Sequence, residues 1–113
     1  MDRLIDMSEP ESRAHIERFN AGVTTGDWSA YLAGFHPDAV MTFDGPPVGP
    51  FVGREAIAEG YATRPPDDTI EILSVRTEGA TDVLRFAWSR GGTGSITIHR
   101  TDELISELSV HFD

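Results

Sequence analysis

Residues 26–61, GDWSAYLAGFHPDAVMTFDGPPVGPFVGREAIAEGY, predict a short helix, a strand, a loop and a second helix in succession. The first helix is indicated by apolar residues at helical spacing, namely Trp28, Tyr31, Leu32 and Phe35. Such spacing predicts one apolar stripe on a helix that has Asp27 as its N-cap. The dipeptide His36-Pro37 should end this helix, because the residue before a proline is pushed out of the helical region.

A strand from Ala39 to Asp44 is expected next, and Gly45-Pro46-Pro47 should end it, because proline cannot continue a sheet ladder. Asp44 is therefore a carboxylate at the mouth of an apolar strand, under a rigid loop. A small enzyme with a pocket would hold a base at such a position. The alternative is a turn, in which the Asp44 side chain hydrogen-bonds to the nearby backbone.

Two further helices are predicted on either side of these elements. One begins at Ser8 and has an apolar stripe made of Ile16, Phe19 and Val23. The other runs from Arg54 to about Thr63, with Ile57 and Tyr61 on one face, and ends at Arg64-Pro65-Pro66.

From Thr69 onward the apolar residues recur with a period of two, which predicts strands. Ile70 and Ile72 alternate, and then Leu73 and Val75 continue on the opposite parity. This shift predicts a β-bulge, as a sharply curved sheet requires.

The last third of the sequence predicts three more strands joined by tight turns. Leu84, Phe86 and Trp88 share one face of a strand that ends at a glycine-rich hairpin, residues 91–94. Ile96 and Ile98 lie on the returning strand. A turn at Asp102-Glu103 precedes a final strand, residues 104–112, which carries Leu108, Val110 and Phe112 on one side. Helices followed by long antiparallel strands indicate the α+β class.

Length and charge exclude several classes of protein. A chain of 113 residues forms one domain, and its formal net charge of −10 argues against nucleic acid as a partner. It has no cysteine, which excludes disulfides and thiolate catalysis. No run of 18 apolar residues is present, so no membrane span is expected. The four histidines lack metal-ligand spacing, and the N-terminus lacks the apolar core of a secretory signal. We expect a cytoplasmic protein without a metal or other cofactor.

The order of elements, with the motifs FHPDA and GREAI after the Gly-Asp turn, resembles the SnoaL-like group of the NTF2-like superfamily, which includes ketosteroid isomerases. The resemblance covers residues 12–113, so 1–113 is expected to be a single SnoaL-like domain. It implies a cone-shaped α+β barrel: three N-terminal helices pack on a curved, mostly antiparallel sheet, and a pocket runs into the cone. It does not fix the reaction, because the superfamily holds isomerases, cyclases, dehydratases, epoxide hydrolases and non-enzymes.

An ungapped comparison with ketosteroid isomerase argues against that activity. Phe19 takes the place of the catalytic tyrosine, Phe43 takes the place of the base, and the protonated aspartate falls near Ser95. The resemblance thus implies the fold of this superfamily but not ketosteroid isomerase activity. Tyr61 matches a family tyrosine that supports the catalytic one, and its hydroxyl either faces the ligand or belongs to the core.

Glu71 and His99 are the other candidates for acid–base chemistry. SnoaL-like epoxide hydrolases use an Asp/Glu pair at about this separation, which implies that Asp44 and Glu71 could share the cavity as base and acid. The alternative is that Glu71, between Ile70 and Ile72, is a solvent-facing residue of a half-exposed strand. His99 is a candidate general base near neutral pH.

Many aromatic residues are available to line a small interior, which suits a flat or polycyclic ligand. The expected ligand-binding residues are Phe19, Trp28, Phe35, Phe43, Phe86 and Trp88. The sequence therefore predicts a cofactor-free isomerase, cyclase or epoxide hydrolase that acts on a hydrophobic molecule. In it Asp44 takes a proton, and Tyr61 or His99 stabilises developing charge. The alternative is a non-catalytic domain that binds a ligand or oligomerises.

A homodimer is also expected. NTF2-like domains commonly pair through the outer face of the sheet. Apolar residues of this chain occur on both parities of its strands, such as Leu73 and Ile105 against Ile72 and Leu108. An antiparallel sheet with one wet face would alternate more cleanly.

Overall fold

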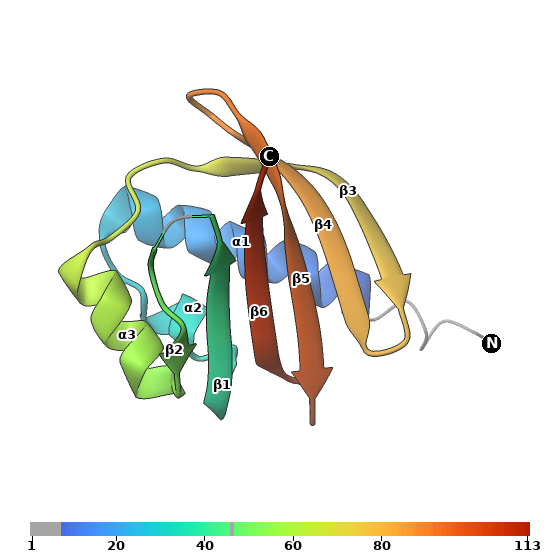
Figure 1. The fold of residues 1–113 in the computed structure, drawn as a ribbon, viewed down its shortest axis with the longest axis horizontal. Coiled ribbons are helices and arrows are strands. Elements are labelled where there is room, and N and C mark those ends of the chain that lie inside the picture. The colour runs from blue at the N-terminus through green and yellow to red at the C-terminus, as the bar shows by residue number, and fades with distance from the viewer. Residues whose placement is uncertain (1–7, 46) are drawn as a thin grey trace.

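The computed structural model describes residues 8–45 and 47–113, which form three helices and six strands (Figure 1). The helices are α1 (Ser8–Thr25), α2 (Ser29–Leu32) and α3 (Arg54–Thr63). The strands are β1 (Phe35–Asp44), β2 (Phe51–Val52), β3 (Ile70–Glu78), β4 (Thr81–Trp88), β5 (Thr93–Thr101) and β6 (Leu104–Phe112). Among the described elements, α3 keeps its predicted bounds, and Pro46 of the predicted Gly-Pro-Pro stop lies outside the described residues.

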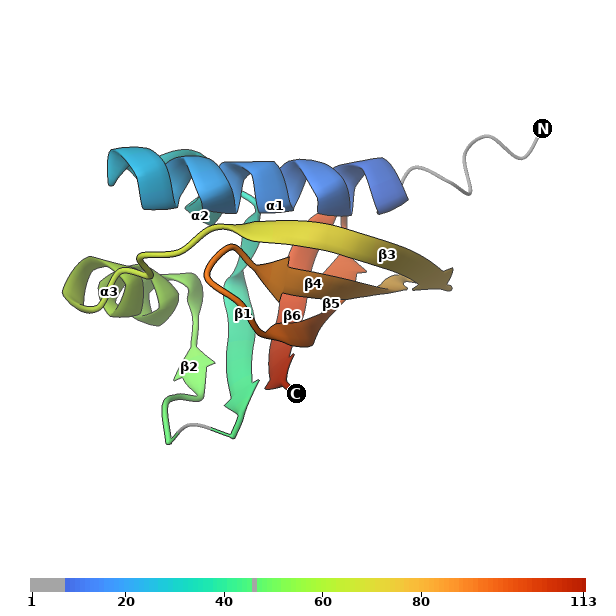
Figure 2. The ribbon, with the colours of Figure 1, turned by 90° about the horizontal axis from the view of Figure 1, so that it is seen from above.

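The strands form one sheet in the order β2-β1-β6-β5-β4-β3, which does not close into a barrel. Neighbouring strands are antiparallel except β1 and β6, which run parallel although they lie far apart in the sequence. Helix α1 crosses one face of the sheet, and α3 packs beside β1 and β2 (Figure 2). This confirms the expected α+β cone with a curved, mostly antiparallel sheet.

The two faces of the sheet differ in polarity. The inner face, which packs against the helices, carries Met41, Phe43, Ile70, Leu84, Phe86, Ile96, Ile98, Leu108 and Val110. The outer face carries Thr42, Asp44, Arg85, Ser95, Thr97, His99, Ser109 and His111, as the strand register and the alternation of side chains require.

Of the register shifts in the sheet, those of β3 and β6 explain the mixed parity of its apolar residues. In β3 the pairing with β4 shifts between Ile72 and Ser74, so Leu73 is the bulged residue and the predicted bulge is confirmed. In β6 the pairing shifts around Ser106, which turns Ile105 into the core, where it is 2% exposed. Ile105 therefore does not belong to the outer face, and the argument for a dimer loses one of its two residues. Leu73 stays 52% exposed.

The prediction of a helix through Phe35 is wrong. Helix α2 ends at Leu32, and Phe35 begins β1, with the backbone N–H of Ile105 bonding to the carbonyl of Gly34 at 2.9 Å. Pairing with β6 thus overrides the helical spacing, and His36-Pro37 lies in the strand. The N-cap of α2 is Trp28 and not Asp27. Asp27 lies one residue earlier, and its carboxylate accepts a hydrogen bond from the Ser29 backbone N–H at 3.0 Å.

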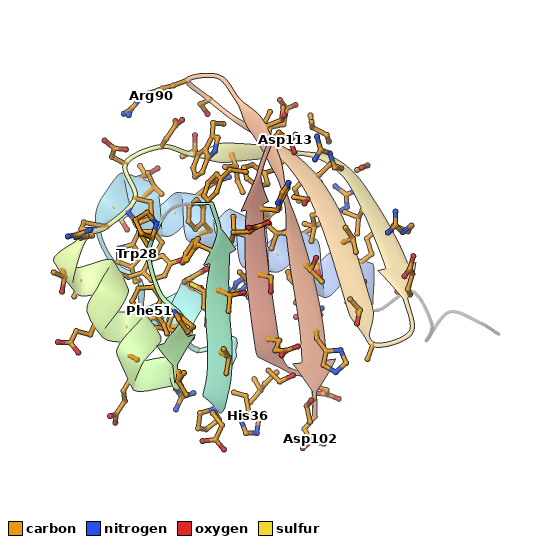
Figure 3. All side chains as sticks on the ribbon, in the orientation of Figure 1. Trp28, His36, Phe51, Arg90, Asp102 and Asp113 are labelled. Atoms are coloured by element: carbon orange, nitrogen blue, oxygen red, sulfur yellow. The ribbon has the colours of Figure 1, made fainter. Side chains whose placement is uncertain are left out.

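The turn between β5 and β6 agrees with the sequence, whereas Thr93 and Gly94 of the predicted 91–94 hairpin belong to β5. Asp102 and Glu103 join β5 to β6 with φ angles of 55° and 71°, a conformation that turns of this type require. Figure 3 shows Asp102 and His36 at one end of the sheet and Arg90 and Asp113 at the opposite end.

Candidate functional site

A cavity of about 570 Å³ lies between the helices and the inner face of the sheet. Its walls come from the three helices, from residues 47–49 of the loop between β1 and β2, and from residues of all six strands. Aromatic and aliphatic side chains make up most of this lining. Such a cavity is large enough for a small organic molecule.

Four of the six predicted ligand-binding aromatics line the cavity: Phe19, Phe43, Phe86 and Trp88. Trp28 and Phe35 are not among the lining residues. A β-carbon at Gly22 would lie 2.4 Å from the Trp28 ring, which shows how closely that ring packs on α1. Phe35 is fully buried beneath the rings of His15 and Tyr31. Both residues therefore belong to the core that supports the cavity.

Tyr31 and Tyr61 place a hydroxyl pair in the wall of the cavity. Their Oη atoms are 2.8 Å apart, and the Tyr61 hydroxyl also lies 3.9 Å from Sδ of Met41. Burial raises the pKa of Tyr61 to about 12 and the pKa of Tyr31 well above its ordinary value. Both phenols are therefore protonated at neutral pH. Tyr61 lines the cavity, and so does Tyr31, which the sequence analysis placed only on a helix stripe.

His15 is a cavity residue that the sequence analysis missed. It is 0% exposed, and neither ring nitrogen has a hydrogen-bond partner among the described residues. Burial, followed by the charges of Arg18 and Arg100, lowers the pKa of His15 to about 3, so the imidazole is neutral. The signal was its position: His15 occupies the same helical stripe as Ile16 and Phe19.

A second buried polar group lies away from the cavity. The Asp82 carboxylate, 0% exposed, accepts hydrogen bonds from Ser12 Oγ at 2.5 Å and from Thr77 Oγ1 at 2.7 Å. Arg100 Nη1 lies 3.7 Å from the same carboxylate and donates to Ser12 Oγ at 3.0 Å. Asp82 shares the inward parity of Leu84, a signal that was readable in the sequence. None of these four residues lines the cavity, so the cluster joins α1 to the sheet.

The structure contradicts the placement of Asp44 in the cavity. Met41 and Phe43 point inward, so Asp44 points to the outer face, where its side chain is 76% exposed. Its Oδ2 lies 2.8 Å from Nδ1 of His111 on the neighbouring strand β6. Side chains alternate along this strand, and the face that turns inward is the one that carries Met41 and Phe43.

Glu71 and His99 are likewise outside the cavity lining, and Glu71 takes the solvent-facing placement that was its alternative. Glu71 is exposed on β3, and His99 lies on the outer face with Nδ1 3.0 Å from Thr81 Oγ1. The expected Asp44–Glu71 pair is thus not brought together at the cavity. Of the described residues that line it, only Glu59 carries a carboxylate, and Glu59 and Arg64 are both exposed.

The described residues contain no group of three or more His, Asp or Glu side chains that could hold a metal ion. Within the same residues, no helix is long and apolar enough to cross a membrane.

Comparisons with known proteins agree with this architecture. A family profile described as a SnoaL-like domain matches residues 16–105. No curated protein matches the chain. A putative polyketide cyclase from Sinorhizobium meliloti is similar in structure, with a TM-score of 0.68, 19% identity, and coverage of 86% of this chain and 93% of that one.

Two other solved structures are similar to the same extent. An NTF2-like protein of unknown function from Cytophaga hutchinsonii has a TM-score of 0.70 and 17% identity, with coverage of 89% of this chain and 88% of that chain. TerC, co-crystallized with polyporic acid, has a TM-score of 0.70 and 19% identity, with coverage of 88% and 89% respectively. At such low identity these likenesses establish the fold alone.

Proposed function

The chain belongs to the SnoaL-like family, and from that membership and the geometry of the cavity we propose that it binds a small, largely apolar molecule inside the cone. An oxygen atom of this molecule lies against the hydroxyl pair of Tyr31 and Tyr61. The observation that carries the proposal is a cavity of about 570 Å³ with two neutral phenols in a mostly apolar wall.

The hydroxyl pair supports a ligand that accepts a hydrogen bond. When one phenol donates to the other, the hydroxyl that accepts still has its own proton, which it can donate to a further acceptor. For Tyr61 the alternative acceptor is the thioether of Met41 at 3.9 Å, which is a weak one. A carbonyl or hydroxyl oxygen would use that proton better. Because burial raises their pKa values, both phenols stay protonated near neutral pH, so they can donate a hydrogen bond to the ligand but cannot act as bases.

A ligand-binding domain is favoured over an acid–base enzyme. Asp44, Glu71 and His99 are absent from the described cavity lining, so the three predicted proton-transfer groups do not reach a molecule held there. If the protein is an enzyme, its chemistry is that of a cofactor-free isomerase or cyclase. Tyr61 would then stabilise an oxyanion that develops on a bound carbonyl. The similarity to a putative polyketide cyclase supports this second candidate.

The experiment that tests the proposal compares two ligands with one carbon skeleton. Fluorenone carries a carbonyl oxygen and fluorene does not. We expect the wild-type protein to bind fluorenone more tightly, in titrations followed by calorimetry. The variant Tyr61→Phe should lose that preference and keep its affinity for fluorene. Failure of the wild-type protein to bind either compound would refute the proposal.

A further inference from the structure

Three aromatic rings form a row with nearly parallel planes in the cavity lining. Phe43 of β1 and Phe112 of β6 have ring centroids 6.4 Å apart and planes that differ by 15°. Phe112 and Trp88 of β4 have centroids 6.4 Å apart and planes that differ by only 5°. Trp88 and Phe112 lie at the end of the sheet marked by Arg90 and Asp113 in Figure 3.

The row is possible because the strand between β4 and β6 carries no side chain at this level of the inner face. Gly94 of β5 pairs with Phe112 on one side and with Phe86 on the other. A β-carbon at Gly94 would lie 2.4 Å from the His111 carbonyl oxygen and 2.7 Å from the Phe86 ring. A β-carbon at Gly92 would lie 3.6 Å from the Trp88 ring. The glycines let rings from two non-adjacent strands become neighbours.

Other aromatic residues of the lining meet this row through their edges. Phe51 is perpendicular to Phe43, at 90°, and Phe86 is nearly perpendicular to Trp88, at 88°. The parallel arrangement is thus confined to Phe43, Phe112 and Trp88 among these rings, and the aromatic residues around them pack edge to face, as is usual.

We propose that the row Phe43–Phe112–Trp88 is a stacking surface that selects ligands with a flat, conjugated ring system over puckered, saturated ones of the same size. This inference rests on the proposed function and names the class of ligand. A flat ring can approach parallel rings in offset-stacked geometry, whereas the axial hydrogens of a saturated ring hold it away from their faces.

The test compares fluorenone with perhydrofluorenone, which has the same skeleton and the same carbonyl oxygen but puckered rings. The protein variants are Phe112→Leu, which removes the central ring of the row, and Phe51→Leu. The second is the matched control, because it makes the same substitution at a lining ring that lies perpendicular to Phe43. Both variants keep an apolar side chain of similar volume, and circular dichroism checks that each is folded.

We expect the wild-type protein to prefer fluorenone. Phe112→Leu should weaken fluorenone binding by about threefold to tenfold and leave perhydrofluorenone unchanged. Phe51→Leu should affect the two ketones equally. If both ketones bind wild type equally, or if Phe112→Leu weakens both alike, the stacking surface is refuted while the binding function stands. If neither ketone binds, the binding function fails and the inference fails with it.

Discussion

The imidazole of His15 stacks on the phenol ring of Tyr31, with ring centroids 4.4 Å apart and planes that differ by 27°. This contact joins helix α1 to the hydroxyl pair at the cavity, because the same phenol bonds to Tyr61. It also requires a neutral imidazole, since His15 is fully buried near Arg18 and Arg100. The stability of the cone near its cavity therefore depends on pH.

The first prediction is that stability falls as the pH drops below about 6.5. The pKa of His15 is about 3 in the folded state and 6.5 in the unfolded state. Between these two pH values the unfolded chain binds a proton at His15 and the folded chain does not. This contribution is complete above pH 6.5 and is lost between 6.5 and 3, at up to about 1.4 kcal/mol per pH unit.

Urea denaturation of wild type and His15→Leu at several pH values measures this pH-dependent contribution to the free energy of unfolding. Leucine removes the titrating group and its two nitrogens, which have no hydrogen-bond partner among the described residues. The variant should therefore be at least as stable as wild type at pH 7.5, and its advantage should grow as the pH falls. Parallel pH dependences for the two proteins would show that His15 is not the responsible group.

The second prediction concerns the hydroxyl pair. Tyr61→Phe leaves the buried hydroxyl of Tyr31 without its partner and should lower the free energy of unfolding by about 1–2 kcal/mol. Tyr31→Phe should act in the same direction. The double variant should recover part of the loss, because removing both hydroxyls leaves no buried group unpaired. Strict additivity of the two single losses would contradict the pairing.

The third prediction is that Asp82→Ala is severely destabilising, by about 3 kcal/mol or more. It leaves Arg100, whose side chain is 12% exposed, without the buried carboxylate that faces it, and it also removes the acceptor of Ser12 and Thr77. Arg76→Ala is the control, because its ion pair with Glu78 is exposed and should contribute little. Equal melting temperatures for the two variants would refute the importance of the buried cluster.

The fourth prediction is that Asp44→Asn changes neither ligand affinity nor, beyond a small effect, the melting temperature at pH 7.5. Asp44 is exposed on the outer face and its partner His111 is exposed as well, so the pair contributes little. A large gain in melting temperature at pH 7.5 would instead indicate a buried carboxylate and contradict the observed geometry.

The fifth prediction is the homodimer, for which light scattering should give about twice the chain mass of 12.4 kDa at micromolar concentration. The remaining structural argument is the exposed Leu73 together with the serine and threonine side chains of the outer face. A particle of 12.4 kDa would contradict it.

Local spacing was sufficient for the class of fold and for most element types. The alternation around Leu84 and Phe86, the parity shift at Leu73 and the proline stop after Thr63 all follow from short-range sterics and burial, and the structure agrees with each. Local spacing also showed that Asp44 shares a face with Thr42, and Phe43 with Met41.

The face that turns inward was decided by pairing between distant segments. Alternation gives two equivalent faces, and only the parallel pairing of β1 with β6, with the bulge at Ser106, directs Phe43 to the cavity and Asp44 to His111, 67 residues away. The same long-range pairing took Phe35 out of its predicted helix. His15, Tyr31 and Tyr61 come from three helices, so their meeting at one cavity is likewise a property of helix packing on the curved sheet, which no local pattern encodes.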